Sequence, residues 1–154
     1  MANIRPATVN DLASVIALNQ KIFFINSDFD EDIIPDFAQT PEGEKYFKEA
    51  IEDKRGCFFI LEENGEMIGY TNGSPVVYMT YRKSKYFEIT NVGVIPEKQG
   101  QGFGKMLMEA ITSWAKEKGF QKIYLNCYAK NTKALDFYKK NGYSIMNVGL
   151  EKEI

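Results

Sequence analysis

The stretch "EKQGQGFGKMLMEAITSWAKEKG", Glu97–Gly119, decides the fold, because it joins a glycine-rich turn to an amphipathic helix pattern. Gly100, Gly102 and Gly104 fall within five residues, just where the helix pattern begins. Glycines at such a position let backbone N–H groups approach a ligand closely, and a helix N-terminus favours anions. The stretch therefore predicts a helix whose beginning binds a phosphate-bearing molecule.

Two familiar phosphate-binding loops do not match this turn. The dinucleotide pattern G-x-G-x-x-G, started at Gly100, ends on Lys105 instead of a glycine. The P-loop pattern G-x-x-x-x-G-K-[ST] has Gln99 in place of its first glycine and Met106 in place of its magnesium-binding Ser or Thr. A nucleotide-binding protein built on either loop is therefore disfavoured.

The composition is that of one ordinary globular domain spanning residues 1–154, with 44% hydrophobic and 26% charged residues. No apolar run approaches the ~20 residues of a membrane span, and the N-terminus lacks a signal core, so we expect a cytoplasmic protein. Two cysteines, Cys57 and Cys127, make no disulfide framework. Histidine is absent, which removes His-ligated metal sites and leaves Glu, Asp, Tyr, Lys or Cys for proton transfer.

Charge is unevenly distributed along the chain. Residues 22–44 hold seven acids and no base, whereas the rest of the chain holds 14 acids and 19 bases. The net charge is −2 and no concentrated basic stripe occurs, so nucleic-acid binding is not expected. An acidic segment in an otherwise mildly basic chain favours a protein that binds two kinds of ligand over one that binds a single kind.

Hydrophobic periodicity and turn signals predict an α/β (α+β) fold with a mixed sheet and helices packed on it. In the first half of the chain we expect a strand at residues 3–7, a helix from 12, an irregular acidic loop at 24–39, a helix from 41, a hairpin at 57–74 and a continuation of the sheet at 76–81. In the second half we expect a strand at 86–95, a helix at 103–119, a strand at 120–129, a helix at 131–140 and one or two closing strands at 143–154. Asn64-Gly65 indicates a type I′ turn in the hairpin.

Two motifs resemble those of the GNAT superfamily, the acetyl-CoA-dependent N-acetyltransferases. Gln99-x-x-Gly102-x-Gly104 is similar to the pyrophosphate-binding signature of the family, and "NTKALDFYKKNGY", Asn131–Tyr143, is similar to its later motif. "IRPATVNDL" near the start also looks like this family. The resemblance covers nearly the whole chain and is weakest at residues 22–56. It implies a single-domain, mainly antiparallel sheet flanked by about four helices, splayed strands that form a CoA cleft, acetyl-CoA as cosubstrate and no metal.

The resemblance also implies which residues bind the cofactor. Backbone N–H groups of the glycine turn would hold the pyrophosphate, and the backbone of the preceding strand would bind pantetheine. Asn131 is either a CoA contact or simply the N-cap of its helix. Gly93 either marks a bulge in the strand or is an ordinary small residue. The expected cofactor-binding residues are Val92, Val94, Gln99, Gly100, Gln101, Gly102, Phe103, Gly104, Lys105 and Asn131.

Glu88 and Tyr138 are the candidate catalytic residues. Glu88 lies eleven residues before Gln99, the offset at which histone-acetylating relatives carry a general base. A carboxylate between two apolar residues would have a pKa raised by desolvation, which suits a base, unless it faces solvent or a salt bridge. If Glu88 faces away from the site, a chain of water molecules would act as the base instead. Tyr138 matches the family tyrosine that protonates or stabilises the CoA thiolate, and core packing is the alternative role.

The acceptor is expected to be an amine: a small molecule, or a lysine or N-terminal amine. The acids Asp28, Asp30, Glu31 and Asp32 would attract a cationic amine, or would be only a solvated loop. Direct attack in a ternary complex is the expected reaction, and a catalytically silent acyl-CoA sensor is the alternative function. Membrane partners are not expected, and family resemblance suggests a homodimer through Met146–Ile154.

Overall fold

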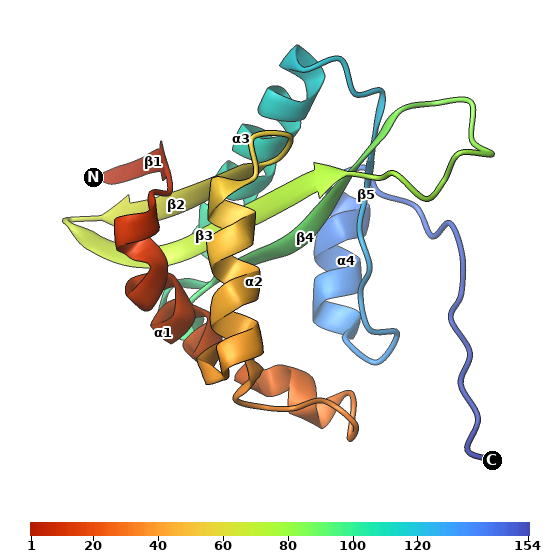
Figure 1. Ribbon diagram of the computed structural model, residues 1–154, viewed down its shortest axis with the longest axis horizontal. Coiled ribbons are helices and arrows are strands. Elements are labelled where there is room, and N and C mark those ends of the chain that lie inside the picture. The colour runs from red at the N-terminus through yellow and green to blue at the C-terminus, as the bar shows by residue number, and fades with distance from the viewer.

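A computed structural model describes all 154 residues and is organised by one five-stranded sheet (Figure 1). The strands are β1 (Ala2–Pro6), β2 (Cys57–Glu63), β3 (Glu66–Pro75), β4 (Tyr86–Val94) and β5 (Lys122–Tyr124), in that order across the sheet. The main helices are α1 (Leu12–Phe23), α2 (Pro41–Glu52), α3 (Phe103–Glu117) and α4 (Thr132–Lys140). β1 to β4 pair antiparallel and β5 joins β4 in parallel. The predicted α+β class with a mainly antiparallel sheet is confirmed.

Helices cover both faces of the sheet. α1 and α2 lie on one face, and α3 packs on the other (Figure 1). Tyr70 on β3 is fully buried in the first layer, where its ring stacks on Phe58 at 5.3 Å and its hydroxyl accepts a 2.7 Å hydrogen bond from Asn19. Phe87 on β4 is the fully buried centre of the second layer and contacts Trp114 of α3. Side chains of α4 extend this second layer.

Local signals in the sequence account for the element ends. Asn64 and Gly65 both have positive φ, 52° and 83°, so the predicted type I′ turn is confirmed. Thr8 and Asp11 form the expected capping box ahead of α1. The Thr40 hydroxyl accepts from the Gly43 N–H and begins α2. Between these helices, residues 24–39 form two short 3₁₀ turns, Phe24–Asp28 and Phe37–Gln39, joined by irregular chain.

A bulge in β4 re-aims its side chains. Asn72 pairs with Asn91 but the next residue of β3, Gly73, pairs with Ile89, so Thr90 is left without a partner in the ladder. The bulge is therefore at Thr90 and not at Gly93. Gly93 is small for another reason, since a Cβ there would lie 2.3 Å from a side-chain carbon of Ile22 on α1.

The sheet opens where β4 and β5 separate. Their pairing covers only three positions and ends at Glu88 and Tyr124. β4 continues to Val94 with no strand on that side, while the chain after Tyr124 leaves the sheet. The predicted strand at 120–129 is therefore only three residues long, and the predicted splay between the two strands is confirmed.

Two predicted sheet segments are wrong. Residues 76–81 lie in the loop between β3 and β4, where Val77, Tyr78 and Tyr81 are exposed. Residues 143–154 form no strand, and Figure 1 shows this C-terminal tail running apart from the sheet. An alternating apolar pattern makes a strand only where a neighbouring strand supplies hydrogen-bond partners. Apart from the Val76 N–H, which donates to the Tyr86 carbonyl of β4, neither segment has such partners. None of the helices is both long and apolar enough to cross a bilayer.

Candidate functional site

The glycine turn presents a row of unpaired backbone donors. None of the six N–H groups from Gly100 to Lys105 donates a hydrogen bond within the chain. Gly100 and Gly102 have φ of 76° and 88°, a region that disfavours other residues, and Gly102 is the N-cap of α3. A Cβ on either glycine would meet no atom within 4 Å. This open row of donors at a helix N-terminus fits a diphosphate.

Side chains on both sides hold the turn in place. The Gln99 amide donates to the Val94 carbonyl at 3.1 Å, and its oxygen accepts from Lys133 of α4 at 3.0 Å. Gln99 therefore braces the turn through its side chain. A Cβ on Gly104 would lie 3.4 Å from the Phe137 ring, so the first turn of α3 packs closely on α4. The Lys98 ammonium pairs with Glu63.

The open edge of β4 carries the backbone groups expected to bind pantetheine. The Ile95 N–H donates to Ile68 on β3 at 2.9 Å. Because successive residues of a strand alternate in direction, the N–H groups of Val94 and Val92 point to the opposite edge, where β5 has left the sheet. The Gln99 bond to the Val94 carbonyl agrees with this direction.

Glu88 lies at the point where the strands separate. Its carboxylate is half-buried on the α1–α2 face and accepts a 3.4 Å hydrogen bond from the Tyr78 hydroxyl. No cation pairs with it. Burial raises the pKa of Glu88, and the hydrogen bond from Tyr78 opposes part of that rise. The sequence left open whether Glu88 is desolvated or instead faces solvent or a salt bridge. In the structure its carboxylate is half-buried and makes no salt bridge.

Three tyrosines near Glu88 were missed in the sequence. Tyr124 is its direct partner in the β4–β5 register. Tyr78 was hidden in a segment read as strand. Tyr46 of α2 accepts a 3.4 Å hydrogen bond from Asn91, and its pKa is raised by burial first and also by the charge of Glu88. The sequence did carry one signal of this polar cluster, namely asparagine within a strand pattern, because strands rarely contain asparagine.

Tyr138 and Asn131 lie on α4, beside the turn. Tyr138 is mostly buried, its hydroxyl has no hydrogen-bond partner within the chain, and burial raises its pKa, with Cys127 and Tyr143 nearby raising it further. The phenol therefore keeps its proton at neutral pH. The Asn131 side chain accepts from the Ala134 N–H at 3.2 Å, so it is the N-cap of α4. Its amide nitrogen is left for another partner.

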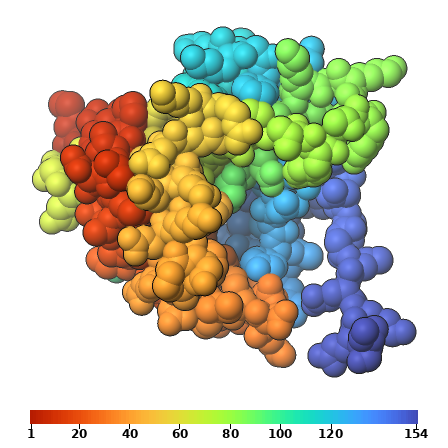
Figure 2. Space-filling view, in the orientation of Figure 1, coloured from red at the N-terminus to blue at the C-terminus, as the bar shows by residue number.

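The acidic loop reaches across to the chain that follows β5. Asp30 accepts a 2.9 Å hydrogen bond from the Tyr128 hydroxyl, and the Phe29 ring packs 6.2 Å from the Tyr128 ring. Asp28, Glu31 and Asp32 are exposed and make no ion pair. Only Asp30 of the four predicted acceptor-binding acids is thus held in a defined position. In Figure 2 the surface is hollowed between α2 and the segment leading into α4.

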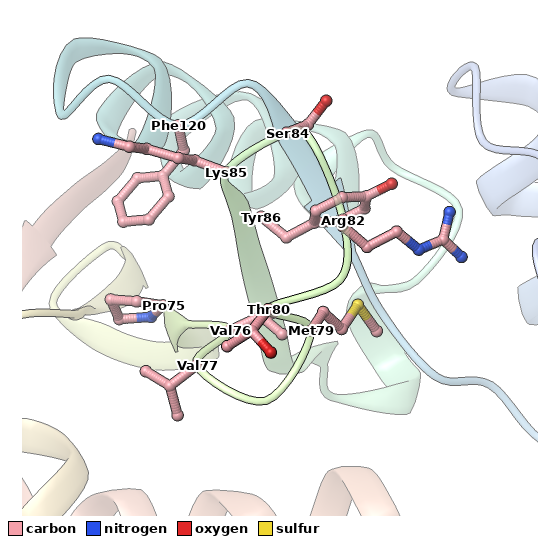
Figure 3. A pocket seen from close by; sticks show the side chains of 10 residues that line it. All are labelled: Pro75, Val76, Val77, Met79, Thr80, Arg82, Ser84, Lys85, Tyr86 and Phe120. Atoms are coloured by element: carbon pink, nitrogen blue, oxygen red, sulfur yellow. The ribbon is translucent and has the colours of Figure 1, made fainter.

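A separate cavity of about 300 Å³ lies in the loop between β3 and β4 and at the start of β4. Figure 3 shows its two cations, Arg82 and Lys85, directed to opposite sides. It lies at the N-terminal end of β4, whereas the glycine turn follows the C-terminal end, so it is not part of the site.

Comparisons with known proteins agree with this geometry. The Acetyltransferase (GNAT) family matches residues 22–143. The uncharacterized N-acetyltransferase YhfO of Bacillus subtilis (strain 168) is 30% identical over 92% of this chain and 89% of its own length. The BH1408 protein from Bacillus halodurans has the same fold, with a TM-score of 0.84 at 23% identity and 99% of both chains covered.

An aminoglycoside N-acetyltransferase, AAC(6')-Iy, solved in complex with CoA, also shares the fold, with a TM-score of 0.75 at 16% identity over 100% of this chain and 95% of its own. The family match covers most of the chain, and the glycine turn, the splayed strands and the helix that follows are the features expected of such a protein. The chain belongs to the GNAT acetyltransferase family and is an acyltransferase.

Proposed function

We propose that residues 1–154 form one N-acetyltransferase domain that transfers the acetyl group of acetyl-CoA to a primary amine by direct attack in a ternary complex. The observation that carries this proposal is the opening between β4 and β5, which has unpaired backbone donors at one end and Glu88 at the other. The CoA complex of a protein with the same fold supports acetyl-CoA as the cosubstrate. Cytoplasmic location stays a prediction from the sequence.

The cofactor would be bound mainly by main-chain groups. The N–H groups of Gly100 to Lys105 would hold the diphosphate, and the positive end of α3 contributes about 0.3–1 kcal/mol for each favourable charge contact. Val92 and Val94 would pair with the pantetheine amides along the open edge of β4. Gln99 and Phe103 support the turn from within, since Gln99 braces it and Phe103 is buried in the core.

Acetyl-CoA supplies the thioester carbonyl that is attacked. Glu88 removes a proton from the acceptor ammonium, and a pKa raised by burial makes it a stronger base than an exposed glutamate. Tyr138 donates its hydroxyl proton, or a hydrogen bond, to the sulfur that leaves. Its unpaired hydroxyl supports this role, and because burial raises its pKa the phenol keeps its proton and favours the hydrogen bond over full proton transfer. On becoming an amide the ammonium loses two protons, one to Glu88 before attack and one from the nitrogen as the C–S bond breaks. The CoA thiolate takes up one proton and the other goes to solvent, so that Glu88 and Tyr138 return to their starting states.

Thiol release from acetyl-CoA with a panel of primary amines tests the function. We expect turnover by the wild-type protein and a kcat lowered about 10²-fold or more in Glu88→Gln, because general bases contribute 10²–10⁴-fold. The control is CoA affinity, which the substitution should leave unchanged. A kcat in Glu88→Gln equal to that of the wild type would exclude Glu88 as the base.

A homodimer is the second part of the proposal. The tail carries exposed apolar side chains at Ile145, Val148 and Leu150, and the outer edge of β5 has no neighbouring strand. A tail of this kind can pair with the sheet edge of a second copy and cover its own apolar residues. Light scattering after size exclusion should give a dimer for the full chain and a monomer after removal of residues 146–154. A monomeric full chain would exclude the dimer.

A further inference from the structure

A second cavity lies on the α1–α2 face of β4 and reaches Asn91, three residues along the strand from the candidate base Glu88. Its volume is about 260 Å³, and it is bounded by the end of α1, the two 3₁₀ turns, α2 and Asn91 of β4. We call it the acceptor pocket. Apolar side chains, among them Phe23, Ile34 and Phe47, make most of its lining, and no charged side chain takes part. A cavity of about 150 Å³ is enough to hold benzene, so a ring fits here with room to spare.

Tyr46 links the pocket to Glu88. Its ring lines the pocket, its hydroxyl accepts from Asn91, and it lies close enough to Glu88 for that charge to raise its pKa. The bulge at Thr90 is what allows Glu88 and Asn91 to face the same side of the sheet. A molecule seated in the pocket therefore extends past Tyr46 toward the proposed base.

The polar part of the lining comes from Asn19, Gln20, Asn26, Ser27 and Asn91, and hydrogen bonds orient two of these amides. Asn91 donates its Nδ2 hydrogens to Tyr46 and Asn72, and Asn19 donates to Tyr70. The Oδ1 atom of each asparagine accepts no hydrogen bond within the chain. An ammonium carries three donors and no acceptor, so free carbonyl oxygens in the pocket lining suit it.

Charge is arranged around the pocket and not inside it. Asp28, Glu31 and Asp32 belong to the same loop, are exposed, and do not line the cavity. The acidic loop attracts a cation, and the pocket itself offers a mainly apolar lining without a charged group. A polyamine or aminoglycoside carries several charged ammonium groups, and no carboxylate lines the pocket to pair with them.

We propose that the acceptor pocket binds the apolar body of a primary amine, such as an arylalkylamine, with its ammonium toward Glu88 and Asn91. This inference rests on the proposed function, because it takes the ammonium as the acetylated group. It narrows the expected acceptor from any cationic amine to an amine whose ammonium is attached to an aromatic or branched aliphatic body.

Binding and turnover of 2-phenylethylamine and spermidine test the proposal. Saturation-transfer NMR without acetyl-CoA reports binding alone, and thiol release reports catalysis. Ile34→Asp places a charge in the pocket lining, and Ile25→Asp is the matched control from the same loop, which does not line the pocket. Both residues are exposed, 59% and 44%, so both variants should fold.

We expect 2-phenylethylamine to bind wild type and Ile25→Asp alike, and Ile34→Asp at least about fivefold more weakly, because apolar burial is lost. Its kcat/KM should exceed that of spermidine by about tenfold or more. Equal use of the two amines, or equal binding losses in the two variants, would overturn the pocket assignment while leaving acetyl transfer standing. If Ile34→Asp weakens binding but no amine is turned over, the result would support the pocket as the binding site for the amine and would exclude the proposed acetyl transfer.

Discussion

Substitution of Gly102 by alanine separates the two roles of the glycine turn, backbone geometry and anion binding. Gly102 has φ of 88°, and a non-glycine residue in that region costs roughly 1–2 kcal/mol. For a chain of this size, a loss of that order lowers Tm by about 2–8 °C. The added Cβ also enters the open space next to the unpaired N–H groups, where the diphosphate would lie.

The cost in CoA affinity follows from the lost hydrogen bonds. A hydrogen bond to a charged group is worth about 1.5–3 kcal/mol, so displacement of a phosphate oxygen from one donor raises Kd about 10- to 150-fold. Isothermal titration of CoA into wild type and Gly102→Ala measures this change directly. Thermal melting of the same samples measures the backbone strain.

Gly119 offers a matched control at the other end of α3. It has φ of 87°, and a Cβ there would also meet nothing within 4 Å. Gly119→Ala should therefore lose the same stability as Gly102→Ala and keep wild-type CoA affinity. If both variants bind CoA as tightly as wild type, or lose affinity equally, then the turn does not hold the diphosphate and the cofactor assignment fails.

Three further perturbations test the site and the core. Tyr78→Phe removes the hydrogen bond that lowers the pKa of Glu88, so the acid limb of the pH profile of kcat/KM should move to higher pH. An acid limb that does not move would show that the ionisation of Glu88 does not control kcat/KM. Tyr138→Phe should lower kcat by about 10²-fold with little change in KM for acetyl-CoA, and an unchanged kcat would leave Tyr138 a packing residue. Gly93→Ala should cost about 1–3 kcal/mol in urea denaturation because its Cβ overlaps α1, whereas Gly149→Ala, with open space around it, should cost nothing.

Local chemistry explains why much of the fold was predictable. The Asn64-Gly65 turn needs two residues at positive φ, and few other dipeptides allow that, so its type follows from the sequence. The glycine turn and the helix after it are specified in the same way. Each of these features depends on residues close together in the chain.

Tertiary pairing explains what was missed. The segment 120–129 has a uniform strand pattern, yet only three residues pair, because β4 and β5 diverge after Tyr124. The tail at 143–154 has an apolar alternation with no neighbouring strand in the same chain. Tyr78, read as part of a strand, instead lies in a loop that carries its hydroxyl to Glu88. In all three cases the deciding partner is distant in sequence.

The separation of β4 from β5 at Glu88 is the feature on which the site depends. If pairing continued along β4, β5 would occupy the hydrogen-bonding groups of Val92 and Val94, and no edge would remain for an extended ligand. Because pairing stops at Glu88, the half-buried carboxylate stands at one end of that edge and the glycine turn at the other, and Asn91, which lines the pocket, lies between them. The bulge at Thr90 then turns Asn91 to the same side. One interruption of the ladder and one extra residue thus place the proposed cofactor edge, the proposed base and the proposed acceptor pocket together along a single strand.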